Sequence, residues 1–169
     1  MNILITGVHG FVGSNLVKAL VPEHTIFGLD IVAPKKEGVK KTFFWEDLPS
    51  TSLGQSQLLD FQKIDAIIHL AGKAHDTRNK SAADVYFKVN TGLTQRIFDW
   101  FLTSKSAKKF IFFSTVKSAA DRVEGEFLTE ECVPTPVGPY GESKIKAEDY
   151  IIEHFAPEAL KRPYHNFND

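Results

Sequence analysis

The sequence contains a single cysteine, no long apolar run and no excess of charge of either sign. That cysteine, Cys132, excludes an intramolecular disulfide and fits a reducing compartment. No apolar run approaches the ~20 residues of a membrane-spanning helix, and the chain opens without the basic and apolar regions of a signal peptide. Lys and Arg number 20 against 21 Asp and Glu, so no strong field favours nucleic acid or an anionic membrane as a partner. These absences predict a cytoplasmic globular protein.

What is present is an alternation of short apolar segments with helix-like segments over 169 residues. This length suffices for one domain with a sizeable core and is too short for two full ones. The alternation predicts an α/β fold, namely a Rossmann-like, doubly wound parallel sheet in three α/β/α layers. We assign residues 1–155 to this domain and residues 156–169 to a C-terminal tail.

The expected elements follow from hydrophobic periodicity. A helix is expected after the first strand, and a stripe at every fourth residue from Val85 to Phe101 predicts a long amphipathic helix starting near Ser81. The last helix, over residues 140–155, is expected to bury a stripe of Ala147, Ile151 and Phe155. A modest helix is also predicted over residues 50–58. The predicted strands are residues 2–6, 25–29, 41–45, 64–70 and 110–113, and the last helix is predicted over residues 140–155.

The first turn of the chain carries three glycines at three-residue spacing, Gly7, Gly10 and Gly13, between a strand and a helix. In this context one glycine makes the tight turn, one lets the backbone approach a pyrophosphate, and one lets the helix pack close to the strand. The N–H groups and the dipole of the helix then face the phosphates. The alternative is a merely flexible turn, but the flanking strand and helix favour dinucleotide binding.

The second strand ends at Asp30, and an acid in that position can accept hydrogen bonds from the adenosine ribose hydroxyls. It would also repel a 2′-phosphate, so NAD is preferred over NADP. A plain helix cap or turn residue is the alternative for Asp30. The fourth strand ends in Ala71-Gly72, where small residues let a cofactor approach the backbone, while His69 within it is interpreted as a satisfied core histidine.

Tyr140 and Lys144 lie four residues apart on the predicted last helix and therefore share one face. A neighbouring cation favours the phenolate form of a tyrosine, which can then take the hydroxyl proton of an alcohol. Thr115, at the end of the fifth strand, supplies a hydroxyl for the same oxygen. The alternative is an exposed Tyr/Lys pair on a surface helix. Because ligands of parallel sheets bind at the carboxyl ends of strands, we expect these residues in one crevice.

Together these segments resemble the extended short-chain dehydrogenase/reductases, and most of all the NAD-dependent nucleotide-sugar epimerases and dehydratases such as UDP-galactose 4-epimerase. The resemblance covers residue 1 to about residue 155. The segments that carry it are Thr6-Gly7-Val8-His9-Gly10-Phe11-Val12-Gly13, Asp30, His69-Leu70-Ala71-Gly72, Asn90, Phe113-Ser114-Thr115 and Tyr140-Gly141-Glu142-Ser143-Lys144.

The resemblance implies that NAD oxidises a sugar at C4 to a 4-keto intermediate. It implies Tyr140 as acid/base, Lys144 as the residue that holds the ribose and tunes Tyr140, and Thr115 as their partner. A UDP-sugar is the implied substrate, and His75, Arg78 and Lys117 are weak candidates to contact it, with loop surface as the alternative. No metal site is predicted. The implied cofactor-binding residues are Gly7, Gly10, Phe11, Val12, Gly13, Asp30, Ile31, Leu70, Ala71, Gly72, Lys73, Asn90, Ser114, Tyr140 and Lys144.

The family usually adds a C-terminal substrate domain, and residues 156–169 do not resemble one. We therefore expect the NAD-binding portion of an enzyme of bacterial surface polysaccharide synthesis, with little activity alone. It would act as a homo-oligomer or with a separate C-terminal half. A non-catalytic NAD-binding or interaction module that acts with a partner is the alternative. A compact reductase is disfavoured by the long stretch between Asn90 and Tyr140.

Overall fold

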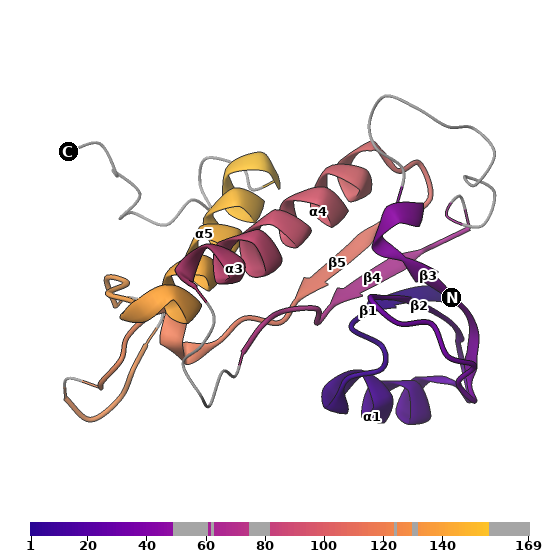
Figure 1. The fold of residues 1–169 in the computed structure, drawn as a ribbon, viewed down its shortest axis with the longest axis horizontal. Coiled ribbons are helices and arrows are strands. Elements are labelled where there is room, and N and C mark those ends of the chain that lie inside the picture. Colours follow the sequence, from indigo (N-terminus) through magenta and orange to yellow (C-terminus); the bar gives the residue numbers. More distant parts are fainter. Residues whose placement is uncertain (49–60, 62, 75–81, 124, 130–131, 156–169) are drawn as a thin grey trace. The chain divides into compact units, whose positions relative to one another are not determined.

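A computed structural model describes residues 1–48, 61, 63–74, 82–123, 125–129 and 132–155. The chain forms two compact units (Figure 1). The sheet unit comprises residues 1–72 and 96–113, and the helical unit comprises residues 73–95 and 114–169. The predicted helix over residues 50–58 and the predicted tail over residues 156–169 lie outside the described residues.

The sheet unit contains a parallel sheet of five strands in the order β3-β2-β1-β4-β5. This is the strand order of one half of a doubly wound fold and its continuation, so the predicted fold class is confirmed. The strands β1 and β2 match the prediction closely, and β2 extends one residue further, through Asp30. The strands are β1 (Asn2–Thr6), β2 (Thr25–Asp30), β3 (Val39–Phe44), β4 (Ala66–His69) and β5 (Lys109–Phe112).

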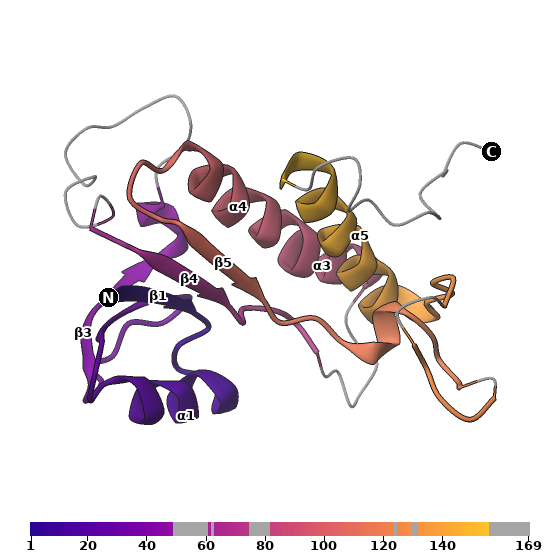
Figure 2. The same cartoon turned by 180° about the vertical axis from the view of Figure 1, so that it is seen from behind.

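Helices cover both faces of this sheet, as Figures 1 and 2 show from opposite sides. The helix α1 (Phe11–Leu20) packs Val17 onto one face, against a core of aliphatic residues from β1, β2 and β4. The other face carries aromatic residues, and the part of α4 (Leu93–Thr103) from Arg96 onward packs there. Phe98 lies with its ring centroid 5.0 Å from that of Phe110 on β5. Burial of these apolar side chains stabilises the sheet unit.

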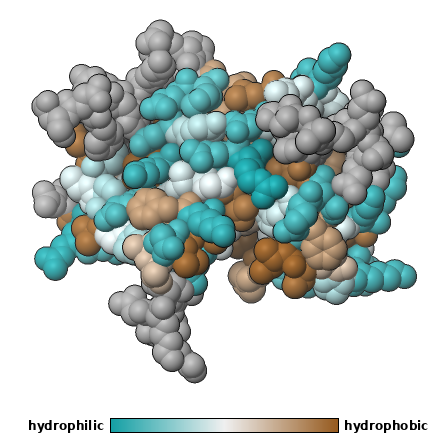
Figure 3. Space-filling view, turned by 45° about the horizontal axis from the view of Figure 1, so that its top comes forward, coloured by the Kyte–Doolittle hydropathy of each residue, from teal (hydrophilic) through white to brown (hydrophobic). Residues whose placement is uncertain are grey.

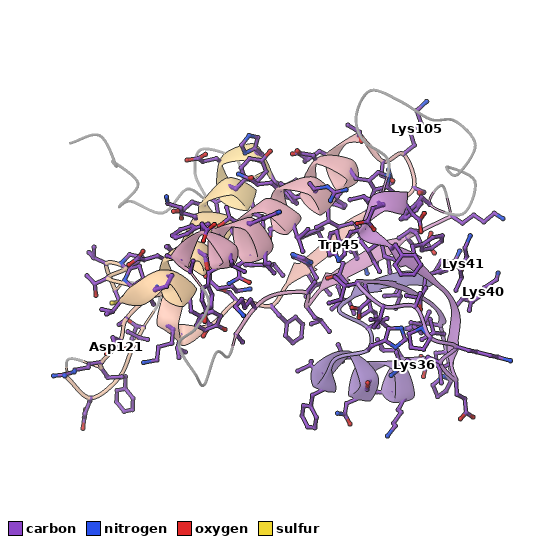
Figure 4. All side chains as sticks on the ribbon, in the orientation of Figure 1. Lys36, Lys40, Lys41, Trp45, Lys105 and Asp121 are labelled. Atoms are coloured by element: carbon purple, nitrogen blue, oxygen red, sulfur yellow. The ribbon has the colours of Figure 1, made fainter. Side chains whose placement is uncertain are left out.

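The third strand differs from its prediction, because β3 begins two residues earlier and ends before Trp45. Trp45 opens a single turn of 3₁₀ helix, η1 (Trp45–Asp47), in which the Asp47 carboxylate accepts a hydrogen bond from the Phe44 backbone N–H (2.8 Å). This local cap competes with strand pairing and ends β3. Lys40 and Lys41 lie on this edge strand, where charged side chains discourage pairing with another chain (Figure 4).

The opposite edge strand, β5, has no charged residue after Lys109. Ile111 of β5 pairs with Ile68, whose side chain lies in the core under α1, and is 47% exposed; Phe113, the residue after β5, is 44% exposed. Elsewhere, hydrophilic residues cover much of the face seen in Figure 3, and hydrophobic residues gather there in smaller groups. Within the described residues, no helix has the length and apolar character needed to cross a membrane.

The helical unit contains α3 (Ala83–Tyr86), a π-helical segment η2 (Phe87–Gly92), the start of α4, a 3₁₀ turn η3 (Val116–Ser118) and α5 (Gly138–Phe155). The long helix predicted from Ser81 is thus present but interrupted by a π segment. Its predicted stripe is wrong at the start, because Val85 is exposed and the buried positions are Tyr86, Asn90 and Thr94. The wider π turn shifts the buried face.

The last helix begins two residues earlier than predicted and ends at Phe155 as predicted. Its stripe is only partly correct, since Ala147 is fully buried, Ile151 is half-buried and Phe155 is exposed. Several buried positions of α5 are instead small or polar: Gly141, Ser143 and Lys144. The face that α5 buries is therefore partly a polar one, which an apolar stripe cannot reveal.

Candidate nucleotide-binding and catalytic sites

The glycine loop joins β1 to α1 in the sheet unit, and two of its positions accept only glycine for conformational or steric reasons. Gly7 has φ +68°, and its N–H donates to the Leu29 carbonyl (2.8 Å). A side chain at Gly13 would collide with the Gly7 carbonyl oxygen, so only glycine allows this approach. Gly10 is the extended N-cap of α1 and offers no side-chain cap, which leaves the N–H groups of the first helical turn facing outward. Such a loop fits the pyrophosphate of a dinucleotide.

Asp30 lies at the carboxyl end of β2 and faces this loop. One of its oxygens accepts from the His9 backbone N–H (3.0 Å), and the other accepts from the Ile31 N–H (2.8 Å). Each oxygen keeps capacity for a further hydrogen bond. The carboxylate is therefore oriented by the backbone of the glycine loop, and it fits recognition of ribose hydroxyls. Phe11, the first residue of α1, is 87% exposed on the loop side.

A buried hydrogen-bond relay fixes the end of β4. The Thr6 hydroxyl oxygen accepts from the backbone N–H groups of Leu70 (3.1 Å) and Ala71 (2.9 Å), and it lies 2.6 Å from Nδ1 of His69. Because both lone pairs of the hydroxyl are used, Thr6 donates its proton to Nδ1 and the His69 ring proton lies on Nε2. The prediction that His69 is a satisfied core histidine is confirmed, since the residue is fully buried.

The three candidate catalytic residues all fall in the helical unit. Tyr140 and Lys144 lie on α5, and Thr115 is the extended N-cap of η3, where its Oγ1 accepts from the Lys117 N–H (3.3 Å). Lys144 is only 6% exposed. Burial lowers the pKa of Lys144 to about 8, and the charge of Glu148 opposes that shift. A lysine with a pKa near neutrality can change its protonation during acid–base chemistry.

Asn90 connects the segment after β4 with α5. Its side-chain oxygen accepts from the Lys73 N–H (2.6 Å), and its amide donates to the Lys73 carbonyl (3.1 Å) and the Ser143 hydroxyl (2.9 Å). Ser143 in turn donates to the Tyr140 carbonyl (2.9 Å). The Thr94 hydroxyl donates to the Asn90 carbonyl (2.6 Å), which occupies a backbone oxygen in the π-helical region. Asn90 thus orients the backbone of the Tyr140–Lys144 helix.

Two contacts that sequence reasoning missed join α5 to the Thr115 segment. A side chain at Gly141 would collide with the Lys117 carbonyl oxygen, so the helix lies directly on that backbone. One turn beyond Lys144, the Glu148 carboxylate accepts from the hydroxyls of Ser114 and Ser118. The four-residue spacing of Lys144 and Glu148 is visible in the sequence, but the serine partners lie more than 29 residues away and leave no signal.

Of the three weak substrate candidates, the structure describes only Lys117. His75 and Arg78 lie outside the described residues. Lys117 is exposed and forms an ion pair (2.6 Å) with Asp121, which Figure 4 labels. The remaining predicted site residues divide between the units: the glycine loop, Asp30 and the end of β4 belong to the sheet unit, and Lys73, Asn90, Ser114, Thr115, Tyr140 and Lys144 belong to the helical unit.

A parallel sheet with this glycine loop between its first strand and first helix is typical of α/β proteins that bind dinucleotides. Residues 3–161 match the profile of the NAD dependent epimerase/dehydratase family, and the chain belongs to that family.

Among similar proteins, a UDP-glucose 4-epimerase of Azospirillum brasilense is 25% identical over 167 residues, which cover 94% of this chain and 46% of the relative. The low-salt glycan biosynthesis protein Agl12 of Haloferax volcanii is 25% identical and is matched over 99% of this chain and 57% of its own length.

Among solved structures, MoeE5 in complex with UDP-glucose and NAD aligns with a TM-score of 0.72 and 25% identity, over 94% of this chain and 50% of that protein. The chain therefore spans about half the length of the proteins it matches.

Proposed function

We propose that this chain is the NAD-binding and acid–base portion of a nucleotide-sugar 4-epimerase or dehydratase that acts on a UDP-sugar. The observation that carries the proposal is the contact, within the helical unit, between the Thr115 segment and the helix that carries Tyr140 and Lys144. Membership of the family supports NAD as the cofactor, and the resemblance to UDP-glucose 4-epimerases and to a glycan biosynthesis protein supports a UDP-sugar and a role in surface polysaccharide synthesis.

In this proposal the sheet unit binds the dinucleotide. The N-terminus of α1 and the loop from Gly7 to Gly13 receive the pyrophosphate, and Asp30 accepts from the ribose hydroxyls. Leu70, Ala71 and Gly72 present backbone that the Thr6 hydroxyl holds in place. NAD, when bound, supplies a hydride acceptor for a carbon that bears a hydroxyl. An acid at Asp30 selects NAD against a 2′-phosphate, since like charges repel.

The helical unit moves the proton. Tyr140 takes the proton of the C4 hydroxyl as the sugar is oxidised to its 4-keto form and returns it when the alcohol is restored. Thr115 donates a hydrogen bond to the same oxygen, and its hydroxyl proton is available because its Oγ1 accepts from Lys117 N–H. Lys144 contributes a positive charge one turn further along the same face of α5. Lys144 would also hold the nicotinamide ribose.

Titration calorimetry with NAD, followed by UDP-glucose on the loaded protein, tests this proposal. We expect NAD to bind, and Asp30→Ala to weaken binding at least tenfold, while Glu142→Gln on the exposed side of α5 leaves it unchanged. Because the relatives are about twice as long, we expect little turnover by the chain alone. Absence of NAD binding by the folded protein would refute the proposal, and UDP-sugar turnover would refute only the inactivity.

The second candidate is a non-catalytic NAD-binding module that acts with a partner, either another copy or a separate polypeptide. The exposed apolar residues Ile111, on edge strand β5, and Phe113, directly after it, favour association. Replacement of Tyr140 by Phe separates the two candidates. A catalytic role predicts that any turnover measured with a complementing partner falls by at least two orders of magnitude, while a pure binding role predicts no change in NAD affinity or partner binding.

A further inference from the structure

The helix α5 contacts the segment from Ser114 to Ser118 at two points, one before and one after Lys144 along the same face of the helix. Gly141 and Glu148 are seven residues apart, two turns of helix, and Lys144 lies between them. Gly141 lies against the Lys117 backbone, and Glu148 binds the hydroxyls of Ser114 and Ser118. The helix and the segment are thus joined on either side of the candidate catalytic lysine.

The Glu148 contact is a specific one. One carboxylate oxygen of Glu148 accepts from the Ser114 hydroxyl, and the Ser118 hydroxyl shares its single proton between that oxygen and the Thr115 carbonyl, each 2.6 Å away. The Ser118 backbone N–H donates to the same carbonyl (3.1 Å). Ser118 is buried and Ser114 is exposed, so the Ser118 side of this bridge is the one that is shielded from water. An ordinary surface glutamate on a helix would pair only with neighbours three or four residues away, whereas these partners are 34 and 30 residues distant.

We propose that Glu148 is a positioning residue that holds the Thr115 segment on the helix carrying Tyr140 and Lys144. The inference deepens the proposed function and rests on it for its catalytic meaning. Its physical content does not depend on the function, because the bridge is made by the chain's own residues. Glu148 also acts through charge, since it raises the pKa of Lys144 against the larger effect of burial.

The surrounding charges do not replace Glu148 in this role. Among the described helices and strands, those with the most extensive contacts to α5 are α3, η2 and η3. Their charged residues are Asp84, Lys88 and Lys117, all of which are exposed, and Lys117 is paired with Asp121. Loss of the Glu148 charge should therefore lower the pKa of Lys144 further, and loss of its hydrogen bonds should loosen the Thr115 segment.

The test uses the full chain without cofactor and has two readouts. The first is the titration midpoint of Lys144, followed by the NMR shift of its side-chain Cε. The second is hydrogen exchange of the Lys117 and Ser118 backbone amides, which donate to Thr115. We expect Glu148→Gln to lower the midpoint and to speed exchange severalfold, and Glu148→Ala to speed exchange at least tenfold. Glu142→Gln, the same change on an exposed position of α5, should alter neither readout.

Ser118→Ala separates the hydrogen bond from the charge, because it removes one donor and keeps the carboxylate. We expect faster exchange with a Lys144 midpoint that does not fall. This variant also keeps the test decisive if Glu148→Ala does not fold. If exchange in Glu148→Gln and Ser118→Ala equals that in Glu142→Gln, Glu148 does not position the segment and the inference fails. NAD binding is measured separately, so its failure would refute the proposed function without touching these readouts.

Discussion

Different kinds of interaction stabilise the interior of the sheet unit and the interior of the helical unit. The sheet unit buries aliphatic residues under α1 and aromatic residues under α4, with one polar relay at Thr6 and His69. The helical unit buries Asn90 and Ser143, which hydrogen-bond to each other, and it also buries Lys144. Apolar packing tolerates small adjustments, whereas a buried polar network is sensitive to each partner. Substitutions in the two units should therefore differ in their pH dependence and in whether a conservative change rescues them.

The largest expected effect on the free energy of unfolding is that of replacing Lys144, in the helical unit. Its pKa is about 8 in the folded protein and 10.5 when unperturbed, so the unfolded state binds more protons between these values. Stability must then rise with pH through this window, because the folded state no longer buries a charge. Below pH 8 the burial penalty is on the order of 3 kcal/mol. Lys144→Met removes it and should stabilise the protein at pH 7.

Urea unfolding at pH 7 and pH 10 measures this effect. We expect the advantage of Lys144→Met over the wild type to shrink as pH rises from 8 to 10.5. Lys88→Met, on the exposed side of η2, is the matched control and should follow the wild type at both values. An equal advantage at pH 7 and pH 10 would mean that improved packing, and not a buried charge, stabilises the variant.

The next largest effect on stability is expected at two glycines that make close backbone contacts, Gly13 in the sheet unit and Gly141 in the helical unit. Gly13→Ala would press a methyl group against the Gly7 carbonyl, and Gly141→Ala would do the same to the Lys117 carbonyl. Each should cost about 1–3 kcal/mol by overpacking. Gly92→Ala is the control, since its methyl would meet the nearest atom outside its neighbours at 3.8 Å. It should be neutral or mildly stabilising in thermal unfolding. Tolerance of Gly141→Ala would contradict the direct contact of α5 with η3.

The sheet unit's polar relay should produce a smaller change, one that a conservative substitution rescues. Thr6→Val keeps the shape but leaves the Leu70 and Ala71 N–H groups and the His69 nitrogen without the hydroxyl. We expect a loss of about 1–2 kcal/mol, and recovery of most of it in Thr6→Ser. Nitrogen-15 NMR of His69 provides a direct readout: Nδ1 should be unprotonated in the wild type and in Thr6→Ser. A proton on Nδ1 would overturn the assignment.

The same contrast explains how much the sequence could predict. Strands β1 and β2, the glycine loop and Asp30 were predictable, because apolar runs and glycine spacing are local signals. The π segment η2 was not, since it depends on buried Asn90 and Thr94, and polar residues at core positions have no periodic signature. The catalytic candidates were found from a motif and a resemblance.

Long-range hydrogen bonds explain the rest of what sequence reasoning missed. Ser118 and Glu148 form one contact although 30 residues separate them. Nothing in the spacing of serines or glutamates along a chain indicates which of them meet. The role of Thr6 was missed for the same reason, because its partners lie 63 to 65 residues away. Partners in such networks are chosen by the fold, so only the structure reveals them.

The smallest expected effect is at the exposed ion pair of Lys117 and Asp121 in the helical unit. Hydrogen bonding and the charge of Lys117 lower the pKa of Asp121, so any stabilisation is present at neutral pH and is lost as pH falls through the folded pKa. Both side chains are in water, where such pairs contribute little. Asp121→Asn should therefore leave the urea midpoint unchanged at pH 7, at low and at high salt. A clearly lower urea midpoint of Asp121→Asn at low salt would show that the ion pair stabilises the loop that contains Lys117 and Asp121. The difference in stability effect between this exposed pair and Lys144 could then not be explained by burial.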